Sequence, residues 1–156
     1  MSSGVKYMMH VGICVTDLER SIRFYRDGLG FSEGGELTVE GEPTATMLDL
    51  PSDMHLDAVY LDREGFRIEL LSYPTPGTVG EAKARPMNQL GLTHFAFRVD
   101  DLDAAIARVE AHGGALVEGS RIRNDVFESD LCYVTDPDGV RLELVQVVQD
   151  PTRPGA

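Results

Sequence analysis

Two halves of the 156-residue chain repeat one pattern, and this duplication constrains the fold more than any local signal. The segment from His10 to Leu18 (HVGICVTDL) aligns with the segment from His94 to Leu102 (HFAFRVDDL), an offset of 84 residues from position 10 to position 94. A chain of this length has room for one ordinary domain or for two small modules. We therefore expect two copies of one module.

Each copy also closes with a similar hairpin. Asp62 to Leu70 (DREGFRIEL) aligns with Asp136 to Leu144 (DPDGVRLEL), and Glu64-Gly65 and Asp138-Gly139 are the turn dipeptides. These hairpins are offset by 74 residues, from position 69 to position 143, which is ten fewer than the opening segments. The first module should therefore carry about ten extra residues, which we place between Glu33 and Pro51.

A strand and then a helix are predicted at the start of each copy, because apolar residues change to helical spacing after each Asp-Leu pair. Thr16 or Asp17, and Asp100 or Asp101, are the candidate N-caps. Strands should follow each helix. The prediction is an α+β chain of two tandem βαβββ modules, at 7–73 and 92–148, with a Pro- and Gly-rich linker at 74–91 and a loosely ordered tail at 149–156.

The net charge of -12 argues against nucleic acid and anionic membranes as partners. No apolar run reaches the roughly 20 residues that span a bilayer, and the first residues do not resemble a signal peptide, so we expect a cytoplasmic protein. Cys14 and Cys132 lie in separate apolar segments without a CxxC motif. They are predicted to be buried, reduced thiols.

Two histidines and two glutamates repeat at matching positions. His10 and His94 open the first strand of each module, and Glu69 and Glu143 lie among apolar residues in the last strand. Taken singly, such a glutamate is more often a solvent-facing residue, and such a histidine is more often a hydrogen-bonded structural residue, than a metal ligand. Because duplicated modules bring matching positions together about a pseudo-twofold axis, the four predict one site for a divalent ion of Zn, Ni, Co, Mn or Fe. His55 and His112 do not repeat and are not proposed as ligands.

Three segments carry a resemblance to a known family: HVGICVTDLERSIRFYRDGLGF, THFAFRVDDLDAAIARVEAHGG and YVTDPDGVRLELVQ. The chain resembles the vicinal oxygen chelate superfamily from about Tyr7 to Val148. This family includes glyoxalase I, methylmalonyl-CoA epimerase, extradiol dioxygenases, and fosfomycin and bleomycin resistance proteins. The resemblance implies a mixed, open eight-stranded half-barrel arrangement of the glyoxalase kind.

The resemblance also implies chemistry. The ligand pattern of bacterial-type glyoxalase I falls on His10, Glu69, His94 and Glu143, and in similar isomerases the last ligand is the base, which here is Glu143 with Glu69 as its counterpart. The substrate would chelate the ion through two neighbouring oxygens and lose a proton next to a carbonyl. Cys14 and Tyr73 stand where glyoxalase I has its glutathione-binding Arg and Asn. We therefore expect a metal-dependent lyase or isomerase of a small molecule that is not glutathione-dependent.

Two other functions remain open. A ferrous extradiol-type dioxygenase needs two histidines and one carboxylate, and the additional Glu69 argues against it. A metal-free resistance protein would sequester a ligand in a cleft of the same fold. The resemblance further implies a homodimer, because members of the family pair their modules either inside one chain or across two chains.

Overall fold

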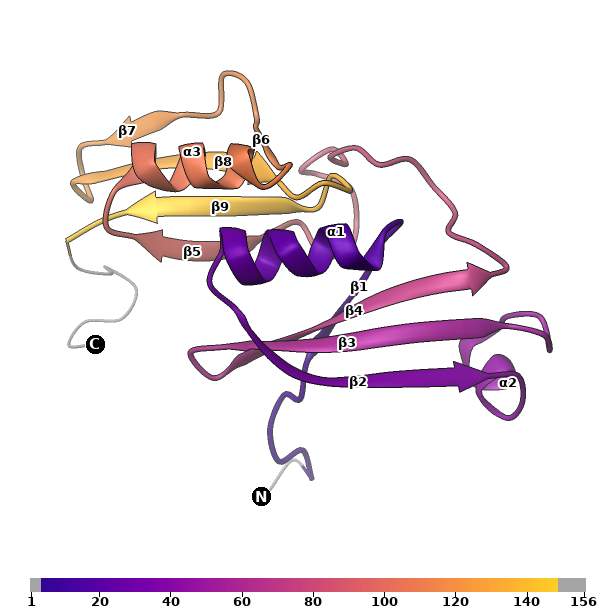
Figure 1. Ribbon diagram of the computed structural model, residues 1–156. Coiled ribbons are helices and arrows are strands. Elements are labelled where there is room, and N and C mark those ends of the chain that lie inside the picture. The colour runs from indigo at the N-terminus through magenta and orange to yellow at the C-terminus, as the bar shows by residue number, and fades with distance from the viewer. Residues whose placement is uncertain (1–3, 149–156) are drawn as a thin grey trace. The chain divides into compact units, whose positions relative to one another are not determined.

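Residues 4–148 are described by a computed structural model of the chain (Figure 1). The chain divides between Gly80 and Glu81 into two units, and this junction falls inside the segment 74–91. Each unit contains one mixed sheet and its own helices. The predicted α+β fold class is confirmed.

The first unit contains a four-stranded sheet in the order β1-β4-β3-β2. Strand β1 runs parallel to β4, and the other neighbours are antiparallel. The parallel register places Gly12 opposite Glu69, and the antiparallel register places Tyr60 opposite the same glutamate. The elements are β1 (Val11–Cys14), α1 (Leu18–Arg23), the π-helical turn η1 (Phe24–Gly28), β2 (Ser32–Glu40), α2 (Thr44–Leu48), β3 (His55–Arg63) and β4 (Phe66–Thr75).

The second unit repeats this topology with the sheet order β5-β9-β8-β6, and β7 also pairs with β8. Strand β5 is parallel to β9, which places Ala96 opposite Glu143. Strand β8 is antiparallel to β9 and places Tyr133 opposite the same glutamate. The elements are β5 (Phe95–Val99), α3 (Leu102–Ala111), β6 (Ala115–Leu116), β7 (Ile122–Asn124), β8 (Ser129–Thr135) and β9 (Arg141–Gln146).

In helices α1 and α3, the second residue of each predicted N-cap pair is the N-cap. The side chain of Asp17 accepts a hydrogen bond from the backbone N–H of Arg20 at 2.9 Å, and Asp101 accepts one from Ala104 at 2.9 Å. Each bond satisfies an N–H that the helix cannot pair internally. The same capping chemistry therefore starts the helix in both copies.

Strand alternation separates the core from the candidate ligands. In β4, Ile68 and Leu70 are almost fully buried and contribute to the face against which α1 packs, together with Ile22 of the helix. Because neighbouring residues of a strand point to opposite faces, Glu69 turns away from the helix. The same pattern recurs in β9, where Leu142 and Leu144 are buried on either side of Glu143.

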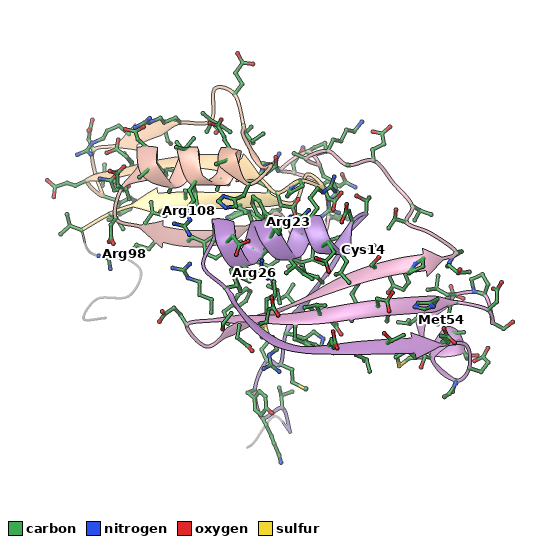
Figure 2. The ribbon with its side chains drawn as sticks, viewed as in Figure 1. Cys14, Arg23, Arg26, Met54, Arg98 and Arg108 are labelled. Carbon is green, nitrogen blue, oxygen red and sulfur yellow. The ribbon has the colours of Figure 1, made fainter. Side chains whose placement is uncertain are left out.

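The additional residues of the first module include helix α2. Ala45 of this helix packs with Met54, Leu56 and Ala58, and all four are buried. Met54 is labelled in Figure 2, beside the short helix. Ala58 lies two residues from Tyr60 along β3, so this cluster covers one end of the sheet face that carries Glu69.

The strand count differs from the predicted eight. Residues 4–148 contain nine strands, because the second module has two short segments, β6 and β7, where the first has the single long strand β2. Both short segments pair with β8. The residues between them include Glu118 and Gly119, where Gly119 has a φ of +73° that interrupts extended backbone.

The two cysteines differ in burial. Cys132 is fully buried in β8, as predicted, and burial raises the pKa of its thiol. The prediction that Cys14 is buried is wrong, because its side chain is exposed. Cys14 ends the edge strand β1 (Figure 2), where Ile13 is the residue that points into the core. Neither thiol forms a disulfide.

The connection between the units has neither helix nor strand from Pro76 to His94. Among the described residues there is no helix with the length and apolar composition to cross a membrane. The tail predicted at 149–156 lies outside the described residues.

Replacing Leu70 by alanine should lower the free energy of unfolding by about 2–5 kcal/mol, because its side chain is fully buried between sheet and helix. The control is Leu37→Ala in β2, whose side chain is 45% exposed; it should change stability by no more than about 0.5 kcal/mol. Urea unfolding of the full chain measures both. Equal losses in the two variants would contradict the assigned core.

Candidate metal centre

His10 and Glu69 meet in the first unit. His10 directly precedes β1, and Glu69 lies in the middle of β4, opposite Gly12 in the parallel pair. Nε2 of His10 lies 3.0 Å from Oε2 of Glu69. Both side chains are partly buried. A Cβ at Gly12 would lie 3.1 Å from Cδ1 of Leu71 and 3.9 Å from Oε2 of Glu69, so a larger residue there would crowd the side chain of Leu71.

Tyr60 completes this first half-site. Its hydroxyl donates a 2.5 Å hydrogen bond to Oε1 of Glu69, the carboxylate oxygen that does not face His10. The ring of Tyr60 also packs edge-on against the ring of His10, with centroids 5.6 Å apart. The hydrogen bond to Glu69, followed by burial and the charge of that carboxylate, raises the pKa of Tyr60. Tyr60 therefore fixes the carboxylate and the imidazole together.

The second unit contains the matching pair. His94 directly precedes β5, and its Nε2 lies 3.2 Å from Oε2 of Glu143 in β9. The ring of Tyr133 packs edge-on against His94, with centroids 5.4 Å apart. Nδ1 of His94 lies 3.0 Å from the hydroxyl of Thr93, which can accept the Nδ1 proton and leave Nε2 as the ligand atom.

The two half-sites differ at the carboxylate. In the described part of the chain, the Tyr133 hydroxyl makes no hydrogen bond to Glu143, although the two residues are cross-strand partners. The pKa of Tyr133 is raised by burial first and by the charge of Glu143 second. Glu69 is thus held by a phenol, whereas Glu143 is not.

Each predicted ligand therefore meets the glutamate or histidine of its own module. Within residues 4–148 there is no cluster of three or more histidine, cysteine, aspartate and glutamate side chains arranged as a metal site. Each unit supplies one imidazole nitrogen and one carboxylate oxygen. The structure shows two separate pairs. That the two pairs share one ion remains a prediction.

The spacing of each pair fits a shared ion. Two donor atoms that each lie about 2.1 Å from one ion, at roughly 90° to each other, are about 3 Å apart. The observed separations of 3.0 Å and 3.2 Å match this geometry. The same separations also suit an ordinary imidazole–carboxylate hydrogen bond. The nitrogen and oxygen donors are those that Zn, Ni, Co, Mn and ferrous iron accept.

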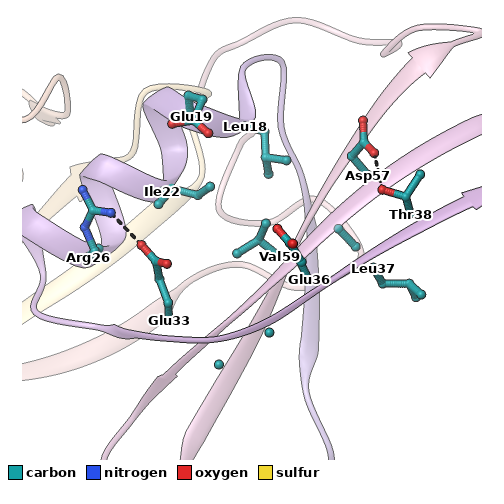
Figure 3. A pocket seen from close by; sticks show the side chains of 13 residues that line it. Leu18, Glu19, Ile22, Arg26, Glu33, Glu36, Leu37, Thr38, Asp57 and Val59 are labelled. Atoms are coloured by element: carbon teal, nitrogen blue, oxygen red, sulfur yellow. Dashed lines mark hydrogen bonds and ion pairs between the residues drawn. The ribbon is translucent and has the colours of Figure 1, made fainter.

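A separate pocket of about 720 Å³ lies in the first unit between α1 and strands β2 and β3 (Figure 3). Leu18 and Ile22 of the helix and Val59 of β3 line it. Arg26 and Glu33 also line it, and they form an ion pair at 2.6 Å. Val59 and Tyr60 are neighbours in β3 and face opposite sides, so this pocket lies on the helix side of the sheet, away from Glu69.

Sequence reasoning missed the aromatic and basic partners of the site. Tyr133 matches Tyr60, and each is the cross-strand partner of its glutamate. Arg67 and Arg141 stand two residues before the two glutamates, and each guanidinium lies 5.7 Å from the ring centre of its tyrosine. The arginines repeat at the same 74-residue offset as the glutamates, and this signal could have identified them.

The two histidines that do not repeat, His55 and His112, have partners of their own. His55 contacts Glu40 at 3.0 Å and Asp57 at 3.1 Å, at the far end of β3 from Tyr60. His112 ends α3, where its Nδ1 lies 2.8 Å from the backbone carbonyl of Arg108. Neither lies beside a candidate ligand.

Comparison with known proteins places this geometry in context. Residues 7–144 match the family described as the Glyoxalase/Bleomycin resistance protein/Dioxygenase superfamily. The uncharacterized protein YaeR of Escherichia coli is 36% identical over 92% of this chain and 98% of its own length. The catechol-2,3-dioxygenase of Bacillus subtilis is 29% identical over 86% of this chain and 40% of its own length. A glyoxalase family protein from Bacillus cereus has a similar structure, with a TM-score of 0.80 and 27% identity over 96% of this chain and 100% of its own.

Replacing Glu69 by glutamine should lower the pKa of Tyr60 toward its ordinary value of about 10. The carboxylate accepts the phenol proton and repels the phenolate, so its loss makes ionisation easier. Tyrosine ring signals followed by NMR over a pH titration of metal-free protein measure this shift. Tyr133, in the other unit, is the internal control and should not move. An unchanged Tyr60 would contradict the hydrogen bond.

Proposed function

Because the chain belongs to the Glyoxalase/Bleomycin resistance protein/Dioxygenase superfamily, we propose that it is a divalent-metal-dependent lyase or isomerase that moves a proton next to a carbonyl group. His10 and Glu69 from one module, and His94 and Glu143 from the other, would hold the ion. The observation that carries this proposal is the repeated pair of Nε2 and Oε2 atoms at 3.0 Å and 3.2 Å. A bound ion would stabilise the negative charge that develops on a substrate oxygen as the neighbouring carbon loses its proton.

Glu143 is the proposed base. A base must release and accept a proton during each cycle, so its carboxylate needs freedom to move. Glu69 has one oxygen fixed by the Tyr60 hydroxyl at 2.5 Å. Glu143 lacks such a bond to Tyr133 in the described chain. The difference supports Glu69 as a fixed ligand and Glu143 as the group that takes the proton.

Glutathione is not the proposed cosubstrate. The position where glyoxalase I has a glutathione-binding arginine holds Cys14, which is exposed but uncharged in its thiol form and cannot form a guanidinium fork on a carboxylate. Tyr73 stands where the family has asparagine. We propose a small substrate chelated through two neighbouring oxygens, and a homodimer as the assembly.

A ferrous extradiol-type dioxygenase is the second candidate. The likeness to a catechol-2,3-dioxygenase favours it, although that likeness spans 40% of the longer protein. Such an enzyme needs two histidines and one carboxylate, which would leave Glu69 or Glu143 without a role. Oxygen uptake by iron-loaded protein with catechol distinguishes the two candidates, because a proton-transfer enzyme consumes no oxygen.

Protein purified without chelators should contain about one divalent ion per chain, since either pairing of the modules provides one four-ligand site per chain. His94→Gln should remove most of this ion, because it deletes a nitrogen ligand. His112→Gln is the control and should retain it. Elemental analysis by mass spectrometry measures all three proteins. A folded wild type that stays metal-free even after incubation with Zn, Ni, Co, Mn and Fe would instead favour a ligand-sequestering protein.

Glu143→Gln should reduce proton exchange next to the carbonyl of a substrate by about 10²–10⁴-fold while the fold is kept. The glutamine can still occupy the position but cannot accept a proton. Deuterium incorporation from D2O into a panel of small α-hydroxycarbonyl compounds, followed by NMR, measures the rate. Glu110→Gln on the exposed side of α3 is the matched control. Full activity in Glu143→Gln would refute the assignment of the base.

A further inference from the structure

Arg67 and Arg141 occupy equivalent places in the two modules. Each stands two residues before a candidate metal ligand on the last strand, and each guanidinium lies 5.7 Å from the ring centre of the tyrosine opposite that ligand. Residues two apart in a strand share a face and lie about 7 Å from each other. Both arginines therefore border the half-site of their own unit.

Arg67 is already neutralised by a carboxylate. Its Nε and Nη2 donate hydrogen bonds to the two oxygens of Asp62, at 2.7 Å and 2.9 Å. Asp62 is the cross-strand partner of Arg67, so the pairing follows from the register of β3 and β4. The bidentate fork uses the strongest hydrogen-bonding geometry available to a guanidinium. Asp62 thus compensates the charge of Arg67 and leaves it three of its five donors.

Arg141 lacks this partner. Its cross-strand neighbour is Thr135, which takes the place of Asp62 and carries no charge. In the described chain Arg141 forms no ion pair, and its Nη1 instead lies 2.8 Å from the sulfur of Met87. A thioether is an uncharged, weak acceptor. The guanidinium therefore keeps its positive charge and most of its five donors for other groups.

The chain is rich in carboxylates that could pair with an arginine. There are 26 acidic and 14 basic residues, so carboxylates outnumber the groups that can pair with them. Arg26, Arg67, Arg121 and Arg123 all form ion pairs with aspartate or glutamate. An arginine beside a candidate active site that has no acidic partner is a position where an external anion can bind.

We propose that Arg141 binds an oxyanion group of the substrate, so that the substrate is a small anion bearing a carboxylate or a phosphate-type group besides its chelating oxygens. The identification of the bound anion as a substrate rests on the proposed function. The anion site itself depends on Arg141 alone. The ring of Tyr133 packs against the guanidinium of Arg141 and orients it. Arg67 takes no part because its guanidinium is paired with Asp62. The broken symmetry at Asp62 and Thr135 assigns the charged end of the substrate to the second module.

The test exchanges the two cross-strand partners. Full-length metal-free protein labelled with ¹⁵N is titrated with inorganic phosphate, and separately with acetate, at constant ionic strength, while the arginine Nε–Hε signals are followed by NMR. In the wild type, the Arg141 signal should shift saturably and the Arg67 signal should not. Thr135→Asp should weaken binding at Arg141 at least tenfold, and Asp62→Thr should make the Arg67 signal respond. Whichever anion binds more tightly identifies the class of the substrate group.

Backbone amide spectra of each variant show whether the fold is kept, and Arg141→Gln provides a second route if Thr135→Asp fails to fold. The proposal is overturned if the Arg141 signal does not respond, if Arg67 and Arg141 respond equally in the wild type, or if Arg141→Gln binds phosphate and acetate as the wild type does. Metal content, measured on each protein before its metal is removed for the titration, reports separately on the proposed function. A metal-free protein whose Arg141 still binds anions would reject the metalloenzyme and retain the anion site.

Discussion

A parallel strand pair in each unit holds one histidine beside one glutamate, and the proposed metal centre depends on that pairing. The register of β1 on β4 places Glu69 opposite Gly12, two residues after His10. A slip of one residue would turn Glu69 toward α1 and expose Leu70 instead. Burying a side chain such as Leu70 is worth about 1.5–3 kcal/mol, so the apolar neighbours of the glutamate protect the register that the site needs.

The features that could be predicted from the sequence are those that depend on local chemistry or on the repeat itself. Asp17 and Asp101 start helices because a short acidic side chain satisfies a free N–H within three residues. The turn at Glu64-Gly65 could be predicted because glycine readily adopts the positive φ that a two-residue hairpin loop needs. In the structure φ is 49° at Glu64 and 77° at Gly65. The four candidate ligands could be selected because their residue types repeat, whereas the contact of each histidine with the glutamate of its own module is a finding of the structure.

The features that could not be predicted depend on contacts across strands. Tyr60 meets Glu69 only because β3 and β4 align in one register, and no local pattern states that register. Cys14 has the apolar neighbours of a buried residue, yet it ends an edge strand with its side chain turned from the helix. The metal site was inferred because the same residue types repeat in both modules. Their hydrogen bonds differ, however, since Glu69 accepts a bond from Tyr60 whereas Glu143 accepts none from Tyr133 in the described chain. Identity of residues thus predicted position better than it predicted environment.

The hairpin loops of the two modules differ in length while the strands they join keep the same alignment. Strands β3 and β4 are joined by Glu64 and Gly65, whereas β8 and β9 are joined by residues 136–140, where the buried Asp136 accepts hydrogen bonds from the backbone of Asp138 and Val140. Tyrosine faces glutamate in both cases. The two closing pairs, Arg63 with Phe66 and Thr135 with Arg141, therefore enclose loops of different length. A longer loop at either tip should therefore leave each tyrosine opposite its glutamate, provided that the closing pair of the hairpin is preserved.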